Sequence, residues 1–301
     1  RNTIQWSYDL LTPAEQRLFR RASVFAGSCT LRAIEVVCGM MGEAGMQVLD
    51  GLESLHDKNL LHQVELPDGE TLILMLETIR EYGLEQLEAH GEVEETRHAH
   101  ARFYLALAEE AEAESEGPQQ VMWLDSLERV HENLRQALHW LLEREEIELA
   151  LRLAGALWWF WMVRGHLREG RQWLEKALAK SEGCTTSVRA KALSRMGMLA
   201  YAQGDFQQAE ISYQQATQLF QELGNKERGA VILYRQGLVA LMKGNHALAT
   251  LLGEEALRTF RTLNYKEGIA DTLLLLAYVA NIQNEYDRAR MLIEESLALF
   301  R

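Results

Sequence analysis

Histidines are the residues of this chain whose type best suits metal binding or proton transfer. His98 and His100 stand two apart in a segment of helical periodicity, so their side chains point in different directions and cannot share a metal ion. His131 and His139 are eight apart and share a helix face, but charged residues such as Glu128 lie on that face too, which is typical of a solvated surface. Neither pair predicts a metal site.

The acidic run from Glu109 to Glu116 is the other candidate for cation binding. It lacks the glycine and the alternating oxygen ligands of a calcium loop, so a solvated acidic helix is the better interpretation. Serine, cysteine and histidine nowhere combine in the local context of a nucleophilic site. The sequence therefore predicts no catalytic residue, no metal and no cofactor.

The cysteines and the apolar runs indicate where the protein resides. Cys29, Cys38 and Cys184 are odd in number and lack metal-ligand spacing, so we expect reduced, mostly buried thiols. Arg152 and Arg164 bracket the longest apolar run, which is too short to cross a bilayer, and the first residues show no charged-then-apolar leader. These features predict a cytoplasmic protein without a membrane partner.

The net charge of −13 is spread unevenly along the 301 residues. Residues 1–90 contribute −7, residues 91–180 contribute −6, and residues 181–301 contribute 0. An acidic first half repels a polyanion. Direct binding of nucleic acid by this half is therefore not expected.

A block of about 40 residues repeats along the second half of the chain. Its turn signals fall at intervals of 39, 40 and 40, at Gly165-His166-Leu167, Gly204-Asp205-Phe206, Gly244-Asn245-His246 and Asn284-Glu285-Tyr286. Small residues recur at fixed positions around each turn, at Gly170, Ala177, Gly197, Ala209, Ala216, Gly237, Ala249, Ala256, Ala277, Ala289 and Ser296. Small residues let paired antiparallel helices approach closely, and stacked pairs form a solenoid. A solenoid favours binding over catalysis.

The first 90 residues show a different pattern. Thr12-Pro13-Ala14-Glu15 is a helix-starting capping box, and apolar residues then recur at helical spacing until Gly27. Thr30 opens a second short helix, and a third begins near Gly45 with Met46, Leu49, Leu52 and Leu55 on one face. Residues 60–66 and 71–74 then read as a hairpin across Pro67-Asp68-Gly69. Three helices and a hairpin form a winged-helix arrangement, here with only Lys58 as a basic residue near the third helix.

The fold class is mainly all-α. We expect a winged-helix-like domain with a small β-hairpin over residues 1–90, a helical linker over 91–145, and an α-α solenoid of about four helix pairs over 146–301.

Several segments resemble bacterial STAND-class regulators, the signal-transduction ATPases related to large LuxR-type and SARP-type transcription activators. The matching stretches cover nearly the whole chain and are Trp6-Ser7-Tyr8, Glu15 to Arg21, Ser23 to Gly27, Met75 to Tyr82, Glu132 to Leu138 and Trp158 to Trp161. The repeats resemble tetratricopeptide repeats of a longer, 40-residue type.

The resemblance implies a switch whose NTPase core lies upstream in the same polypeptide, because this chain has no G-x-x-x-x-G-K-[ST] phosphate loop. In related switch ATPases a Met-His-Asp motif near the end of the winged helix places its histidine beside the nucleotide. Met75, Leu76 and Glu77 match that motif here. Since Leu76 cannot donate a hydrogen bond, the alternative is that Met75 and Leu76 pack while Glu77 caps or pairs.

The resemblance to tetratricopeptide repeats also implies a ligand groove along the first helix of each pair. Counting from the small residue of each repeat gives the groove candidates Arg152, Trp159, Met162, Lys191, Ser194, Met198, Tyr201, Tyr234, Leu238, Leu241, Asp271, Tyr278 and Asn281. This mixture of aromatic, thioether and a few charged side chains suits an apolar or mixed peptide better than a bare anion. Some of these side chains would instead pack against the next repeat.

These features predict a non-enzymatic sensing module that binds a protein, a peptide or a small inducer in the groove and relays binding through the winged helix. One alternative is a transcription regulator whose winged helix contacts DNA, which an acidic third helix would oppose. A second is a passive scaffold whose repeats hold a partner without switching.

Overall fold

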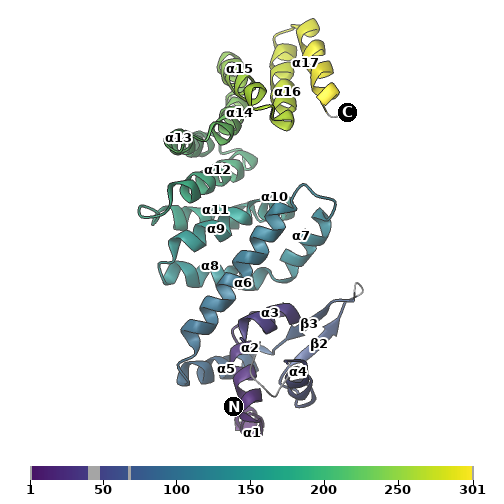
Figure 1. The fold of residues 1–301 in the computed structure, drawn as a ribbon, viewed down its shortest axis with the longest axis vertical. Coiled ribbons are helices and arrows are strands. Elements are labelled where there is room, and N and C mark those ends of the chain that lie inside the picture. Colours follow the sequence, from purple (N-terminus) through teal and green to yellow (C-terminus); the bar gives the residue numbers. More distant parts are fainter. Residues whose placement is uncertain (1, 40–47, 67–68, 300–301) are drawn as a thin grey trace. The chain divides into compact units, whose positions relative to one another are not determined.

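The computed structural model describes residues 2–39, 48–66 and 69–299 and divides into two compact units (Figure 1). The first unit ends at Phe160 and the second begins at Trp161. The division into residues 1–90, 91–145 and 146–301 stays a prediction. Among the described helices, none is long and apolar enough to cross a membrane.

The first unit begins with helices joined by short turns: α1 (Asn2–Asp9), α2 (Pro13–Ala22), α3 (Leu31–Val37) and α4 (Val48–Asp57). The predicted capping box of α2 is confirmed, because Thr12 Oγ1 accepts from the Glu15 N–H at 3.3 Å and Glu15 Oε2 accepts from the Thr12 N–H at 2.7 Å. α2 ends at Ala22 and not at Gly27. Tight turns follow α2, where the Ser23 hydroxyl donates to the Arg20 carbonyl at 2.6 Å.

The third predicted helix is α4. Its predicted start near Gly45 and Met46 lies outside the described residues. Leu52 and Leu55 are buried as predicted, but Leu49 is 49% exposed, so the expectation of one apolar face including it is wrong. Leu49 lies in the first turn of α4, where it reaches the surface of the unit.

A three-stranded antiparallel sheet completes the winged helix, with β1 (Ser28–Thr30), β2 (His62–Glu65) and β3 (Thr71–Leu74) in the order β1-β3-β2. The predicted hairpin is confirmed as β2 and β3, paired from His62 opposite Leu74 to Glu65 opposite Thr71. Pro67 and Asp68 of its turn lie outside the described residues. β1 is not predicted from sequence, because three residues are too few to show an alternating pattern.

Further helices of the first unit follow the sheet: α5 (Glu77–Ala89), α6 (Val93–Ala113), α7 (Gln120–Arg129), α8 (His131–Glu143) and α9 (Ile147–Ala156). α5 ends two residues before Gly91, and the Gly117-Pro118 pair lies between α6 and α7. α6, which lies within the predicted linker, packs against α3 of the winged helix and against α8 and α9.

The buried amide of Asn133, on α8, fastens that helix to the segment between α2 and β1. Asn133 Nδ2 donates to the carbonyls of Ala26 and Ser28, both at 2.8 Å. Its Oδ1 accepts from the Ala26 N–H at 2.8 Å and lies 3.1 Å from His100 Nε2. All four hydrogen-bonding positions of the amide are therefore used. Burial lowers the pKa of His100 to about 4, so its ring is neutral and donates through Nε2.

A buried charge network holds α2 against the start of α6. Arg20 is 6% exposed; it donates to the Tyr8 hydroxyl at 2.9 Å and pairs with Glu92 at 2.5 Å. Arg21 pairs with the second oxygen of Glu92 at 3.0 Å and donates to the Cys38 carbonyl at 2.9 Å. Glu92 thus pairs with both guanidinium groups, and Glu95, 3.6 Å from Arg21, supplies the second negative charge that the two arginines need.

α10 (Trp158–Arg164) carries the boundary between the units. The second unit continues with helices that alternate in direction: α11 (Leu167–Leu178), α12 (Thr186–Ala202), α13 (Phe206–Glu222), α14 (Lys226–Met242), α15 (His246–Leu263), α16 (Lys266–Ile282) and α17 (Tyr286–Leu299) (Figure 1). The contacts are densest between α12 and α13, α14 and α15, and α16 and α17. These pairs match the 40-residue repeat, and the predicted solenoid is confirmed.

The small residues of the repeat lie at the helix contacts, as the sequence predicts. Ala209, Ala249 and Ala289 are at most 5% exposed. A Cβ added to Gly197 would lie 2.5 Å from the ring of Tyr213, which is closer than atoms can approach. Glycine is therefore required where α12 meets α13, because the tyrosine ring occupies the space of a side chain.

Candidate functional site

The groove candidates of the second unit lie on the first helix of each pair, α12, α14 and α16. We call their surface the repeat face; it comprises Lys191, Ser194, Met198, Tyr201, Tyr234, Leu238, Leu241, Asp271, Tyr278 and Asn281. Met198, Tyr201, Tyr234 and Leu238 are partly buried, and Tyr278 is 60% exposed. Ser194 is only 7% exposed. Most of these side chains are therefore at least partly accessible to a partner, and several of them also pack against the buried core of the unit.

Contacts between helices show that these residues form one surface. Met198 and Tyr201 of α12 pack on a buried cluster that includes Val239 of α14. Tyr234 and Leu238 of α14 pack on a second cluster that includes residues of α16. Burial raises the pKa of Tyr234 to about 12, with smaller contributions from the charge of Asp271 and the phenol of Tyr201. Residues of neighbouring repeats are thus in contact along these helices.

The candidates of the first repeat are less open. Arg152 forms a double ion pair with Glu109 of α6, at 2.9 and 2.8 Å, so its guanidinium is already occupied. Trp159 is 5% exposed and cannot present its ring to a ligand in this conformation. Both residues belong to the first unit, whereas Met162, which is partly buried, belongs to the second. Their role in a groove stays a prediction.

Two residues of the repeat face are missed by the sequence argument. Leu274 is 44% exposed on α16, three residues before Ala277, where the same counting rule would have found it. Arg235 follows Tyr234 on α14, and its Nη1 donates to Ser194 Oγ at 2.7 Å, which links α14 to α12. Arg235 falls between the positions that the counting rule selects, so nothing in the sequence pattern indicates it.

The nucleotide-proximal candidates lie where β3 leads into α5. Met75 is partly buried, and Glu77 pairs with Arg80 at 2.6 Å, an ion pair that holds the pKa of Glu77 below its usual range. Leu76 is the N-cap residue of α5 and is 54% exposed. The alternative expectation was that Met75 and Leu76 pack and that Glu77 caps or pairs. Pairing by Glu77 is confirmed, whereas packing by Leu76 is wrong.

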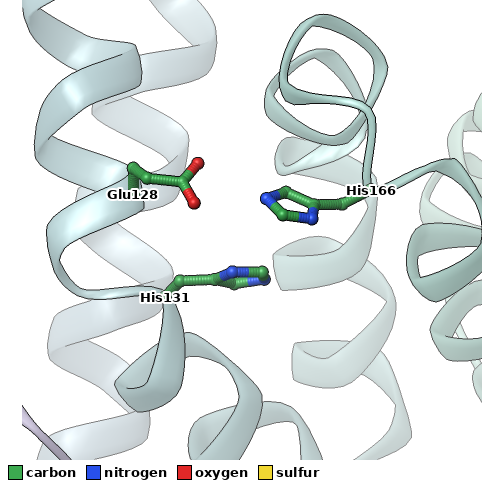
Figure 2. A group of neighbouring side chains, drawn as sticks. All are labelled: Glu128, His131 and His166. Atoms are coloured by element: carbon green, nitrogen blue, oxygen red, sulfur yellow. The ribbon is translucent and has the colours of Figure 1, made fainter.

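The histidines have different environments from those predicted. His131 is 8% exposed, and its ring lies edge-on to Phe160 at 5.1 Å, so a solvated face shared with His139 is wrong. His139 is exposed and lies 3.6 Å from Glu143. Figure 2 shows Glu128 at the end of α7 and His131 at the start of α8, both in the first unit; His166, also drawn, belongs to the second.

The third helix of the winged helix exposes acidic side chains. Asp50, Glu53 and Asp57 of α4 are all exposed. Lys58, the basic residue nearest to this helix, is paired with Glu15 at 2.9 Å. A helix with this surface repels a phosphate backbone.

Two hollows of the second unit lie away from the repeat face. One of about 870 Å³ is lined by the start of α11 and the turn before α13, where Arg171 already binds Gln203 at 2.8 Å and Asp205 at 3.1 Å. The other, of about 290 Å³, lies between α13, α14 and α15 and is bridged by the pair of Lys243 and Glu210. The charged groups Arg171, Lys243 and Glu210 of these hollows are already paired, so the repeat face remains the better candidate.

Comparisons with known proteins agree with this architecture. Residues 188–262 match the family model of the tetratricopeptide repeat. Over 204 residues the chain is 37% identical to a "Putative HTH-type transcriptional regulator" of Mycobacterium bovis, with the same figures for the one of Mycobacterium tuberculosis. The alignment covers 66% of this chain and 23% of the relative, so the chain spans less than a quarter of these relatives. The predicted resemblance to large transcription regulators is confirmed by this sequence similarity.

One solved structure shares the fold of the repeats at low sequence identity, and a second is similar at a lower TM-score. The TPR-like repeats of a Podosopora anserina protein match with a TM-score of 0.52 and 17% identity, over 66% of this chain and 95% of that one. A STAND protein with a tetratricopeptide repeat sensor from Pyrococcus horikoshii matches with a TM-score of 0.47 and 16% identity, over 97% of this chain and 51% of that one. The second unit is a tetratricopeptide-type helical array.

Proposed function

We propose that this chain is a non-enzymatic sensing module of a larger regulator, which binds a protein or peptide on the repeat face. The observation that carries the proposal is the repeat face itself. Met198, Leu238 and Tyr278 hold equivalent positions on α12, α14 and α16, each directly after the small residue of its helix, and all three are at least partly exposed, as are Tyr201 and Tyr234. Exposed aromatic and thioether side chains aligned over successive repeats are typical of binding surfaces.

The regulator in question would carry an NTPase core elsewhere in the same polypeptide, and the winged helix would relay partner binding to it. Two observations support this role. The buried amide of Asn133 fastens the linker helix α8 to the winged helix, so movement of one is transmitted to the other. Leu76, at the position that the STAND resemblance places near the nucleotide, is 54% exposed and free to contact a core. Partner binding would shift an equilibrium between closed and open forms.

The surface charge of the winged helix favours this role over DNA reading. The exposed face of α4 carries Asp50, Glu53 and Asp57, and a helix entering the major groove would need the opposite charge. The helix-turn-helix named in the mycobacterial relatives would then lie in a part of the polypeptide other than this one.

The location of the binding surface is tested by cross-linking from matched positions. Tyr278 on α16 and Tyr286 at the start of α17 are both 60% exposed, but only Tyr278 lies on the repeat face. We expect a photo-reactive amino acid at position 278, expressed in the native host, to capture a discrete partner. The same group at position 286 should capture none. Equal capture at both positions would count against the repeat face.

Switching is tested separately from binding. In the longer polypeptide, replacing Tyr201 and Tyr278 together by alanine should abolish the effect of the partner on nucleotide exchange, whereas Tyr286→Ala should leave it intact. If the partner binds but never changes nucleotide exchange in the unmodified protein, the chain is a passive scaffold.

A further inference from the structure

A hollow of about 410 Å³ lies within the first unit, between the winged helix and the helices that follow it. Its walls come from the start of α3, from β3, from α6 and from α7. α6 packs against both α3 and α7, so the hollow lies beside the place where these helices meet (Figure 1). Its volume falls within the range of about 300–1,000 Å³ that is typical of small-molecule pockets.

The walls of this hollow are mainly aromatic and apolar, and part of their surface is open. Leu31 of α3, and Phe103 and Leu107 of α6, are partly exposed. Met122 of α7 is 51% exposed, and the neighbouring Trp123 is partly exposed as well. A molecule that enters the hollow would therefore meet aromatic rings and a thioether, which make favourable contacts with flat apolar groups.

The charged residues that line the hollow are already paired. Arg129, the last residue of α7, pairs with Glu70, just before β3, at 2.8 Å. Arg32 of α3 pairs with Glu110 of α6 at 3.2 Å. A charged ligand would have to compete with one of these pairs for its own counterion. The hollow therefore favours an uncharged molecule.

Two hydrogen-bond donors in the walls have no partner among the described residues. They are the indole Nε1 of Trp123 and the hydroxyl of Tyr104, and both atoms are buried. Burial raises the pKa of the Tyr104 phenol well above its usual value, so it keeps its proton, and an indole N–H can only donate. A buried donor without a partner is unfavourable, and an acceptor bound in the hollow would relieve this cost.

We infer that this hollow binds a small, uncharged aromatic molecule that carries an acceptor oxygen, such as a ketone or amide carbonyl. The ring of the ligand would lie against Phe103, Met122 and the indole of Trp123. Its oxygen would accept from the Trp123 N–H and the Tyr104 hydroxyl, because a carbonyl oxygen has two lone pairs and can satisfy both donors. The site is separate from the repeat face, since all its residues belong to the first unit.

A ligand in this hollow would hold two parts of the first unit together. α3 and β3 belong to the winged helix, whereas α6 and α7 follow it, and the hollow has walls from both parts. Binding would therefore stabilise the packing of the winged helix against these helices. The module would then respond to a small molecule as well as to a partner on the repeat face.

Two probes of similar shape, acetylnaphthalene and ethylnaphthalene substituted at the same ring position, test the site on the full 301-residue chain. Only acetylnaphthalene carries an acceptor oxygen. In nitrogen–proton correlation NMR spectra, the indole N–H signal of Trp123, identified by its loss in Trp123→Phe, should shift with acetylnaphthalene and much less with ethylnaphthalene. Hydrogen exchange should slow in both β3 and α7 when acetylnaphthalene is bound.

Affinities of variants separate hydrogen bonding from packing. Trp123→Phe and Tyr104→Phe each remove one donor and keep an aromatic ring in place. Each should weaken binding of acetylnaphthalene by about 3- to 10-fold and change binding of ethylnaphthalene by less than about 2-fold. Trp140→Phe is the matched control and should change neither affinity, because the Trp140 N–H is also buried and unbonded but does not line the hollow.

Several results would overturn the assignment. They are failure of both probes to bind, an equal loss of affinity for both probes in Trp123→Phe and Tyr104→Phe, and a loss of the same size in Trp140→Phe. Slower exchange in neither β3 nor α7 would place the probe elsewhere and would also count against it. Tyr104→Phe should not lower the thermal midpoint of the free chain, because it removes a donor without a partner. A marked fall would show that the hydroxyl is already bonded in the free protein, which contradicts its role in the site.

Discussion

Replacing Asn133 by alanine should weaken the connection between the winged helix and α8. The amide makes hydrogen bonds with the Ala26 N–H, the Ala26 and Ser28 carbonyls, and His100 Nε2. Alanine leaves all of these groups without a partner in a site where Asn133 is 0% exposed. Each buried group without a partner costs about 1–3 kcal/mol, though water entering the vacated space would recover part of it.

The expected loss follows from these terms. Because water recovers part of the loss, we take about 1–1.4 kcal/mol for each of the four groups; subtracting about 0.5 kcal/mol for the better helix propensity of alanine leaves a destabilisation of about 3.5–5 kcal/mol. With a urea dependence of about 2 kcal/mol per M, the midpoint of the first unit should fall by about 1.5–2.5 M. Hydrogen exchange should rise first in residues 22–30, because the Ala26 N–H loses its acceptor.

The measurement combines urea unfolding with hydrogen exchange followed by mass spectrometry, so that the first unit is observed separately from the second. Gln136→Ala is the matched control, since it removes an amide from the same helix at a partly exposed position without a side-chain hydrogen bond in the described structure. The reasoning is refuted if Asn133→Ala lowers the midpoint no more than Gln136→Ala does, or if protection of residues 22–30 is unchanged.

Three further predictions concern packing and acid stability. Gly197→Ala should destabilise the second unit by about 1–3 kcal/mol, because the new Cβ would overlap the Tyr213 ring. Gly229→Ala places its Cβ in open space and should stabilise the unit by up to about 1 kcal/mol. Thermal unfolding of the two variants checks both values. Desolvation raises the pKa of Glu15, but hydrogen bonds to its carboxylate outweigh this effect and lower the pKa to about 2. The ionised carboxylate therefore stabilises the fold above its ordinary pKa of 4.5, and this contribution is lost as the pH falls toward 2. The loss should be missing from the pH profile of stability of Glu15→Gln. Burial lowers the pKa of His100 from 6.5 to about 4, so the ring takes up its proton at a higher pH in the unfolded chain than in the folded one. Stability should therefore decrease as the pH falls from 6.5 to about 4. NMR titration of the ring and acid unfolding of His100→Gln test this prediction.

The features that repeat or depend on neighbouring residues follow from the sequence. The 40-residue spacing of the turns and small residues predicts the helix pairs from α12 to α17, because close helix packing requires a small side chain at each crossing. The capping box of α2 and the hairpin of β2 and β3 are likewise local, since each involves residues a few positions apart. Composition was enough to predict a mainly helical chain and an acidic first half.

Contacts between distant residues could not be read from the sequence. β1 exists because it pairs with β3, more than 40 residues away, and its three residues carry no pattern of their own. His131 lies on a helix face that looks solvated, but Phe160 covers it. Leu49 occupies an apolar position in the pattern and is exposed all the same.

Arg235 marks the limit of the sequence argument most clearly. The sequence places it on a helix beside Tyr234, in a segment whose acidic and basic residues balance. Its position against Ser194, away from every described carboxylate, results from the packing of α12 against the following repeat. Local sequence predicts which segments form helices, although α2 ends at Ala22 and not at Gly27. Only the tertiary structure decides which charges are neutralised, because a counterion is defined by distance in space and not by spacing along the chain.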